Sequence, residues 1–274
     1  MKIGLVLSGG GVLGVAHISV LKELEANNIK ISAISGCSSG AIIGALYADG
    51  GILRIEAFLR DLEDAGLFAK RNIKFALPDK VFDQIRQSLQ KNLRSKKFYD
   101  LSVDYCCTAT DLIAGKAISL HDGDLVDSIM ASASYPGVFQ AQEIGGKILI
   151  DGGVTNNLPV LPIKNKTDFI IGSSLHKVQS LEKLDTVKKL SRLAVTLRSI
   201  DLMQQELAEI AAKDCDFVFY PPIEEFNWYN FDKIFEIEKI SDQYAGGRIK
   251  ELKKIISNRT EKRKGFWSDL FAGR

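Results

Sequence analysis

Short apolar runs alternate with amphipathic segments along the first part of the chain. Ile3–Leu7 is a continuous apolar run that ends at Ser8 and three glycines, and this pattern predicts a strand buried on both faces. Residues 15–27 place apolar side chains at helical spacing, residues 31–35 predict a second strand, and residues 41–46 are apolar on every side, as in a central helix. Strand, turn and helix in this order, twice over, predict a parallel sheet.

The rest of the chain continues the mixture of strands and helices. Residues 52–100 are charged and amphipathic, which predicts two or three surface helices broken near Gly66 and Pro78. Without an internal repeat or a low-complexity linker, residues 1–258 are expected to form a single α/β domain. Further strands are predicted at 104–109, 116–120, 147–150, 169–173 and 217–220, and further helices at 125–134 and 186–213. The stripe of the last helix that is predicted to face the core consists of Leu190, Leu193, Ala194, Leu197, Leu207 and Ile210.

Composition and charge narrow the classes of protein that fit. The 274 residues are 46% hydrophobic and carry a net charge of +2 at pH 7, so they can bury a large core and lack the strong positive charge typical of nucleic-acid binding. The four cysteines have neither zinc-site nor disulfide spacing, which favours reduced thiols. No apolar run approaches the roughly 18 residues that cross a bilayer. We therefore expect a cytoplasmic protein with no metal, cofactor or nucleic acid, and no pattern indicates an oligomeric state.

The sequence ISGCSSG has the form of a nucleophile elbow. Only Ser38 has glycine at both minus two and plus two, Gly36 and Gly40, and it lies between an apolar strand and a helix. The strand and helix backbones pass so close in such an elbow that a Cβ at either flanking position would collide. The turn raises the central hydroxyl to the amino end of a helix, where free N–H groups favour negative charge. The alternative is a glycine-rich turn without chemistry. The other side chains of the stretch are expected to be structural, with local hydrogen bonds for Ser35 and Ser39 and a buried thiol for Cys37.

A second glycine-rich loop follows the first predicted strand. Because this strand neighbours the one that leads to Ser38, the backbone N–H groups of Gly9, Gly10 and Gly11 are candidates for an oxyanion hole. The same loop, with Gly14, also spells the GxGxxG of a dinucleotide site. That site needs an acidic residue at the end of the second strand, and this sequence has none there.

A nucleophilic serine also needs a base, and the strongest candidate is Asp151. It ends the predicted strand at 147–150 and is followed by Gly152 and Gly153, which let the chain turn away beside the site. A carboxylate with an ordinary pKa is a poor base, so Asp151 is expected to be buried. The alternative is an aspartate that only caps the next turn. None of the three histidines, His17, His121 and His176, has a recognisable catalytic setting.

Four motifs in this order resemble the patatin-like phospholipases, in particular the small bacterial members of that family. They are SGGGVLG at 8–14, GCSSG at 36–40, ASASYPGVF at 131–139 and DGGVTNNLP at 151–159. The resemblance implies a three-layer α/β fold with a central, mostly parallel sheet flanked by helices. It covers roughly the first 175 residues of the chain.

The resemblance also implies a Ser-Asp dyad, in which Ser38 attacks an ester carbonyl, Asp151 takes its proton and no histidine is needed. The two side chains are then expected to meet at the carboxyl edge of the sheet. One departure from the family is Leu13, which stands where an arginine or lysine usually precedes the last glycine of the loop. Asn156, Asn157 and Pro159 are expected to brace the turn after the aspartate.

The sequence therefore predicts a serine lipid acyl hydrolase of the phospholipase A, lysophospholipase or carboxylesterase type. An acyltransferase with the same covalent step, and a lipid-binding or regulatory protein without turnover, stay open as alternatives. No residue pattern distinguishes phospholipid, lysophospholipid, neutral glyceride or thioester substrates. Residues 52–100 are a candidate lid over the site.

The end of the chain is basic and aromatic. From Arg248 onward there are nine basic and three acidic residues, so this part has a charge of +6 and the rest −4. Within residues 259–274 a basic segment is followed by large apolar side chains that would share one helical face. Such a tail suits the surface of an anionic membrane, which would place the protein at its inner face. The alternative is a terminal helix docked on its own domain. The apolar residues are Phe266, Trp267, Leu270 and Phe271.

Overall fold

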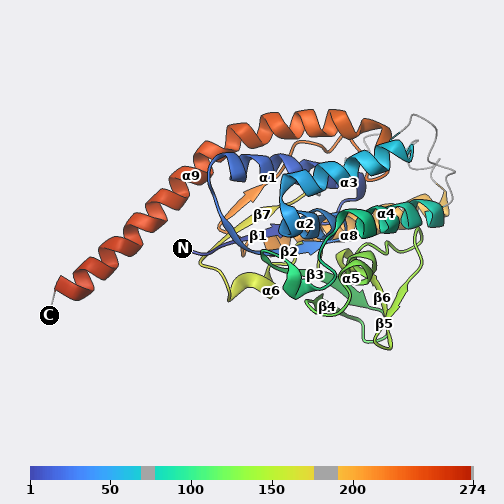
Figure 1. Ribbon diagram of the computed structural model, residues 1–274, viewed down its shortest axis with the longest axis horizontal. Helices are drawn as coiled ribbons and strands as arrows, with labels where there is room; N and C mark the ends of the chain where they lie inside the picture. The colour runs from blue at the N-terminus through green and yellow to red at the C-terminus, as the bar shows by residue number, and fades with distance from the viewer. Residues whose placement is uncertain (69–77, 176–190, 273–274) are drawn as a thin grey trace.

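The computed structural model describes residues 1–68, 78–175 and 191–272, with residues 262–272 as backbone only. Within these residues the chain forms an eight-stranded sheet with helices on both faces (Figure 1). The strands are β1 (Ile3–Leu7), β2 (Ile31–Cys37), β3 (Asp104–Asp111), β4 (Lys116–Leu120), β5 (Gln142–Ile144), β6 (Lys147–Asp151), β7 (Phe169–Ser173) and β8 (Phe217–Phe219).

The sheet has a parallel centre and one antiparallel edge. Its order is β5-β6-β3-β2-β1-β7-β8, with β4 paired to β3 beside this path. All pairings from β3 through β2, β1 and β7 to β8 are parallel. The strands β4, β5 and β6 join by antiparallel pairing. The predicted α/β class with a mostly parallel sheet is therefore confirmed.

Helices cover the two faces of the sheet unequally. Strand β1 shows the division, because Leu5 and Leu7 point into the larger core while Val6 points into a smaller one with Ile163 and Ala208. The larger core lies under α1 (Ala16–Ala26), α2 (Ser39–Gly50), α3 (Ile52–Asp64), α4 (Pro78–Asn92), α5 (Leu125–Ser132) and the first part of α9 (Ile234–Ala272). The smaller core lies under α6 (Leu161–Lys164) and α8 (Arg192–Ala212). Two layers of helices around one sheet make three layers.

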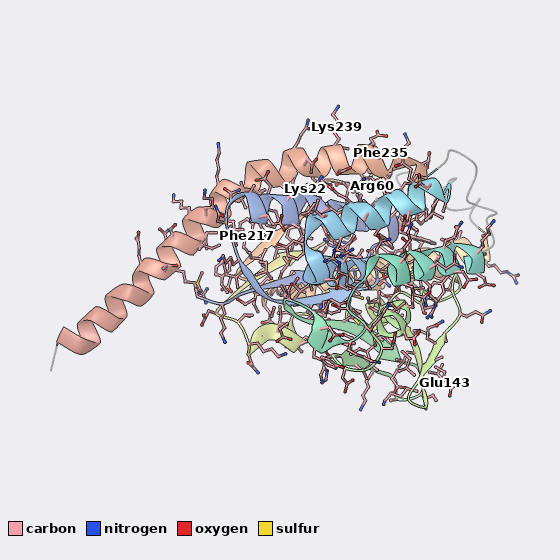
Figure 2. The ribbon with its side chains drawn as sticks, viewed as in Figure 1. Lys22, Arg60, Glu143, Phe217, Phe235 and Lys239 are labelled. Atoms are coloured by element: carbon pink, nitrogen blue, oxygen red, sulfur yellow. The ribbon has the colours of Figure 1, made fainter. Side chains whose placement is uncertain are left out.

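The long helix α9 packs along α1 and then extends away from the body of the protein (Figure 1). Lys22 of α1 donates to Glu238 of α9 at 2.8 Å, and Figure 2 shows Lys22 between the two helices. Further along α9, the guanidinium of Arg248 lies 4.7 Å from the centre of the Phe217 ring. Arg259 still pairs with Asp216 of the body. The helix runs without a break from the predicted domain into the predicted tail.

The predicted elements agree with the structure in most places. Strands β1, β4 and β7 have the predicted bounds, and the other predicted strands differ by one or two residues at their ends. The segment 52–100 forms the helices α3 and α4, while residues 69–77 lie outside the described residues. Strand β5 and helix α6 were not predicted, because three and four residues are too short to show a periodicity.

The predicted core stripe of α8 is wrong at two of its positions. Leu193 and Ile210 are 56% and 62% exposed, and Leu190 lies outside the described residues. Its buried side chains are Gln204, Ala208 and Ala212, while Ala194, Leu197 and Leu207 of the predicted stripe are half-buried. Ala208 and Ala212 belong to the smaller core with residues of β1, β2 and β7, and α8 also contacts the turn after Asp151. Small side chains let a helix lie this close to a sheet.

Strand register brings Ser38 and Asp151 to one level of the sheet. Cys37 of β2 pairs with Thr108 of β3, and the next β3 residue, Ala109, pairs with Asp151 of β6. Strand β6 runs antiparallel to β3, so the direction of the strand does not bring Asp151 to the carboxyl ends of the parallel strands. Asp151 reaches the level of Ser38 because β6 is short and pairs only with residues 109–111 at the end of β3, which is the strand next to β2.

Candidate active site

Ser38 occupies a strained turn between β2 and α2. Its φ of 52° and ψ of −121° place a non-glycine residue in a region that L-residues rarely adopt. The predicted close approach is present on both sides of the turn. A Cβ on Gly36 would lie 2.5 Å from the Gly40 carbonyl oxygen, and a Cβ on Gly40 would lie 2.6 Å from the Ser8 carbonyl oxygen. A side chain at Gly36 or Gly40 would therefore not fit between these backbone segments.

Ser132 holds the backbone of the elbow in place. The Ser38 N–H donates to Ser132 Oγ at 3.0 Å, and that hydroxyl in turn donates to the Thr108 carbonyl at 2.6 Å. Ser132 is fully buried at the end of α5. No sequence pattern assigned a role to this serine. Its only signal was its place in the ASASYPGVF motif, which says that the position matters but not which partner it has.

Asp151 is a buried carboxylate with its hydrogen bonds on one side. It is 1% exposed, and its Oδ1 accepts the Gly153 N–H at 2.7 Å and the Cys37 thiol at 3.8 Å. Oδ2 has no hydrogen-bond partner among the described residues. The carboxylate is therefore held through one oxygen while the other is left for a further donor.

Burial gives this carboxyl an unusual acidity. It raises the pKa of Asp151 from its ordinary 3.8 to about 6, while hydrogen bonding from the Ser38 hydroxyl is the largest effect that lowers this pKa. Because Oδ2 lacks a donor in hydrogen-bond geometry, the Ser38 hydroxyl lies near the carboxylate without a well-aligned hydrogen bond. Such loose geometry is common in catalytic pairs before substrate binds.

Gly152 and Gly153 are required for the close packing of the turn after Asp151. A Cβ on Gly152 would collide with the Thr108 carbonyl of β3, and one on Gly153 would lie 2.6 Å from Gln204 Nε2 of α8. The turn is a single 3-10 segment, η4 (Gly152–Val154), capped by the Asp151 side chain. The aspartate therefore does cap its turn, and its second oxygen keeps no hydrogen-bond partner among the described residues.

The glycine loop supplies two free backbone donors. The Gly9 N–H is occupied, because it lies 3.2 Å from the side-chain oxygen and 3.3 Å from the backbone oxygen of Asn157. No hydrogen bond within the described residues uses the N–H of Gly10 or Gly11. Gly11 has a φ of +59° and packs against the Trp228 backbone, which also accepts the Val12 N–H at 2.9 Å. Of the three predicted oxyanion donors, Gly10 and Gly11 are thus available.

Several other predicted residues have structural positions. Asn157 braces the turn after Asp151 against the glycine loop, as expected. Leu13 lies in the hydrophobic core, where a cation would be unfavourable. His17 is buried and hydrogen-bonds to Ser173 Oγ at 2.8 Å and to the Ser8 carbonyl at 2.9 Å. His121 is exposed, and His176 lies outside the described residues.

The remaining chemistry-bearing groups of the described residues form no second site. All four cysteines are free, and Cys37, Cys106 and Cys107 are buried. No cluster of three or more histidine, cysteine, aspartate or glutamate side chains in the described part of the chain could hold a metal ion. Nor does any described helix combine the length and apolarity needed to cross a membrane.

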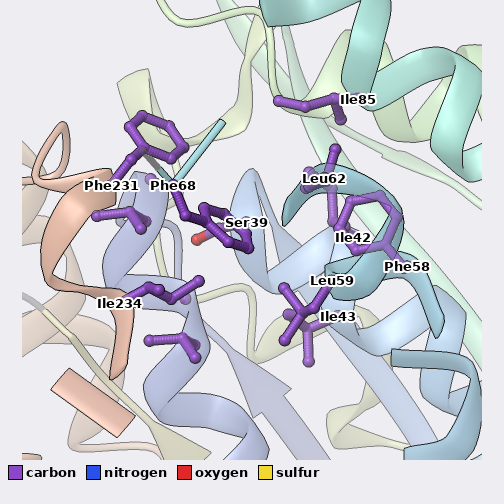
Figure 3. A pocket seen from close by; sticks show the side chains of 14 residues that line it. Ser39, Ile42, Ile43, Phe58, Leu59, Leu62, Phe68, Ile85, Phe231 and Ile234 are labelled. Atoms are coloured by element: carbon purple, nitrogen blue, oxygen red, sulfur yellow. The ribbon is translucent and has the colours of Figure 1, made fainter. Parts of the chain in front are cut away.

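Two cavities lie on either side of the elbow and the aspartate. The first, of about 80 Å³, borders Gly11 and Ser39 and runs beside α2 and α3 (Figure 3). The second, of about 210 Å³, borders Gly153, Ile200 and Gln204 between η4 and α8. The segment 52–100 contributes side chains to the first cavity, and its role as a lid stays a prediction.

Comparisons with known proteins agree with these observations. A family model described as patatin-like phospholipase matches residues 5–163. An NTE family protein of Mycobacterium tuberculosis is 30% identical over 181 residues, which are 64% of this chain and 49% of the relative. Lysophospholipase NTE1 of the yeast Debaryomyces hansenii is 27% identical over 278 residues, 89% of this chain and 18% of the relative. The chain thus spans about half the length of the mycobacterial relative and under a fifth of the yeast one.

Among solved structures, VipD from Legionella pneumophila has a similar fold. It superposes with a TM-score of 0.55 at 11% sequence identity, covering 91% of this chain and 67% of that one. At this identity the likeness concerns the arrangement of strands and helices alone.

Proposed function

Because the chain belongs to the patatin-like phospholipase family, we propose that it is a serine lipid acyl hydrolase that forms an acyl-enzyme on Ser38. One observation carries the proposal. A strained serine at the amino end of α2 lies beside a buried aspartate with a raised pKa, and the two come from strands brought level by the sheet register. Strain and an unusual pKa at the same place are typical of functional sites.

In the proposed reaction Asp151 acts as the general base. Ser38 Oγ attacks the carbonyl carbon of the ester while its proton passes to the Asp151 carboxylate. The carbonyl electron pair moves onto the oxygen, and the free N–H groups of Gly10 and Gly11 stabilise that charge. The intermediate then collapses, and the alcohol leaves with the proton from Asp151. Water repeats the sequence on the acyl-enzyme and releases the fatty acid and free Ser38.

The acidity of Asp151 supports this assignment. A carboxyl of pKa about 6 is still mostly charged at neutral pH, so it can accept a proton, and it is a stronger base than an ordinary aspartate of pKa 3.8. The Gly153 N–H keeps Oδ1 fixed, so Oδ2 is the oxygen that receives the proton. No histidine is required.

A fluorophosphonate probe tests the nucleophile directly. Wild type should be labelled and Ser38→Ala should not, whereas the matched control Ser32→Ala, at an exposed serine of β2, should label like wild type. Absence of labelling in correctly folded wild type would contradict the proposal and favour a lipid-binding protein. Labelling that persists in Ser38→Ala would place the nucleophile elsewhere.

The substrate class follows from the family and from its named members. Since the yeast relative is named a lysophospholipase, phospholipids and lysophospholipids are the first esters to test, with neutral glycerides and short esters for comparison. Adding an alcohol or thiol acceptor distinguishes transfer from hydrolysis, because an acyltransferase would form a new ester instead of free acid.

We also propose that residues 259–274 contact an anionic membrane from the cytoplasmic side. The last part of α9 extends away from the body (Figure 1), and the chain from Arg248 onward has a charge of +6. Removal of residues 263–274 leaves Arg259 and its ion pair with Asp216 in place. This truncation should reduce co-sedimentation with phosphatidylserine vesicles but not with neutral ones. Equal binding by the full and truncated chains would refute the membrane contact.

A further inference from the structure

The cavity beside α2 is almost wholly apolar. Its walls come from the glycine loop, α2, α3, α4 and the segment that begins α9, and Figure 3 shows aliphatic and aromatic side chains converging from these elements. Among the described residues that line it, only Ser39 has a polar side chain. Its volume of about 80 Å³ is roughly half that of an engineered 150 Å³ apolar cavity that binds benzene.

This cavity adjoins the proposed catalytic site through Ser39 and Gly11. Ser39 directly follows the proposed nucleophile, and Ile42 and Ile43 lie one helical turn further on the same face of α2. Gly11, whose N–H is free, lines the same space. When an ester carbonyl lies at Ser38 with its oxygen toward the glycine loop, one of the two groups on the carbonyl carbon can therefore enter the cavity.

The walls determine which substituent fits. Among the described residues no charged side chain borders the cavity, so a phosphate or a charged headgroup would lose its hydration there without gaining a partner from them. Water is also poorly held, because an ordered water needs two to four polar partners and the walls offer one hydroxyl. An alkyl chain loses nothing on entry and gains contact with apolar surface.

The Ser39 hydroxyl gives the cavity a polar end. Ser39 is 8% exposed, its Oγ has no hydrogen-bond partner among the described residues, and Figure 3 shows the oxygen directed into the cavity. A buried hydroxyl without a partner is unfavourable, so a ligand that brings an acceptor to this end is preferred over a plain hydrocarbon. The carbonyl oxygen of an ester is such an acceptor, and the acyl chain attached to the same carbon then extends into the cavity.

We infer that this cavity binds the acyl chain of the ester substrate, with the ester group at Ser39 and the first carbons along Ile42. The inference rests on the proposed hydrolase function and adds to it the part of the substrate that is selected. The alcohol portion, including any charged headgroup, stays outside this cavity. Since the space is small, Phe58 and its neighbours on α3 limit how many carbons enter before the chain must bend out or displace α3.

Chain-length profiles of p-nitrophenyl esters, from acetate to decanoate, test the inference. For wild type, kcat/KM should rise about fourfold per methylene over the first carbons and then flatten, because each buried methylene contributes a fixed transfer free energy. Ile42→Trp fills the cavity, so the hexanoate-to-acetate ratio of kcat/KM should fall at least tenfold. Phe58→Ala enlarges it and should move the flattening to longer chains. The control Leu53→Trp, at a 76% exposed position of α3, should keep the wild-type profile.

The outcomes separate this inference from the proposed function. If an active Ile42→Trp protein keeps the wild-type chain-length profile, this cavity does not bind the acyl chain. The same conclusion follows if Leu53→Trp lowers the hexanoate-to-acetate ratio as much as Ile42→Trp does. Neither result affects the role of Ser38 as the nucleophile. If Ile42→Trp fails to fold, Phe58→Ala alone decides, and an unshifted profile there would also overturn the inference. Failure of the proposed function has a different signature, namely no fluorophosphonate labelling of wild type.

Discussion

Replacing Asp151 by asparagine should make the folded protein more stable while it abolishes turnover. The side chain keeps its shape, and its amide oxygen can still accept the Gly153 N–H that Asp151 Oδ1 accepts at 2.7 Å. What disappears is a negative charge on a residue that is 1% exposed. Since burial is the main reason for its raised pKa, the charged form is the one that the folded state disfavours.

The magnitude and the pH window follow from the two pKa values of this carboxyl. In the unfolded chain it releases its proton near pH 3.8, and in the folded protein near pH 6. The folded state binds more protons between these values, so the free energy of unfolding of wild type falls as pH rises through the window. A difference of about 2 pKa units corresponds to about 3 kcal/mol. The stabilisation by Asp151→Asn should therefore be near zero below about pH 4 and reach up to about 3 kcal/mol above pH 7.

Urea unfolding followed by circular dichroism, at pH values from 4 to 7.5, measures this difference. The matched control is Asp122→Asn, an exposed aspartate in a loop, whose difference from wild type should not follow the same window. A stability difference for Asp151→Asn that does not change with pH would contradict the raised pKa. An asparagine variant less stable than wild type at pH 7.5 would mean that the folded protein favours the charged carboxylate.

Three further predictions concern the base and the elbow. The kcat/KM of ester hydrolysis should fall as pH drops through about 6, because Asp151 must be charged to accept the proton. Cys37→Ala removes a donor to Asp151 Oδ1, so the pH at which kcat/KM falls should rise by about half a unit. Cys37→Ser keeps a donor and should not raise this pH. If the pH does not change in the alanine variant, Cys37 has no positioning role. Gly40→Ala should destabilise the fold by about 1–3 kcal/mol and reduce fluorophosphonate labelling, since its Cβ would lie 2.6 Å from the Ser8 carbonyl oxygen. In contrast, Gly247→Ala in α9, where a Cβ meets nothing within 4 Å, should stabilise by about 0.5–1 kcal/mol; equal thermal shifts in the two variants would contradict the close approach at the elbow.

The elements that the sequence predicted well are those whose cause is local. The strand Ile3–Leu7 and the elbow around Ser38 depend on apolar runs and on glycines within a few residues of each other, and the structure has both where they were expected. Asp151 was a candidate base because it ends a predicted strand and precedes two glycines, and the family resemblance then added its pairing with Ser38. The physical reason for their closeness is the register of three strands, which no single segment of sequence contains.

The features that the sequence did not predict depend on contacts between distant segments. Helix α8 buries Gln204, Ala208 and Ala212 most deeply, although its sequence places larger apolar side chains beside them, because small side chains let the helix approach the sheet closely. The Gly9 N–H is withdrawn from the oxyanion site by Asn157, which is 148 residues away in the chain. Ser132 anchors the Ser38 backbone from a separate helix. In each case a side chain of ordinary appearance acquires its role from a partner that periodicity cannot reveal.

The proposed site concentrates two features that work against stability. Ser38 holds a positive φ that glycine would adopt without strain, at a cost of about 1–3 kcal/mol, and Asp151 carries a charge that burial disfavours by a comparable amount. Both lie at the same level of one sheet, and Ser132 and Gly153 fix them by direct hydrogen bonds. A chain optimised for folding alone would place glycine at one position and asparagine at the other. The two costs fall on the two groups that ester hydrolysis requires, a lifted hydroxyl and a basic carboxylate, which is the distribution expected when a site is built for chemistry.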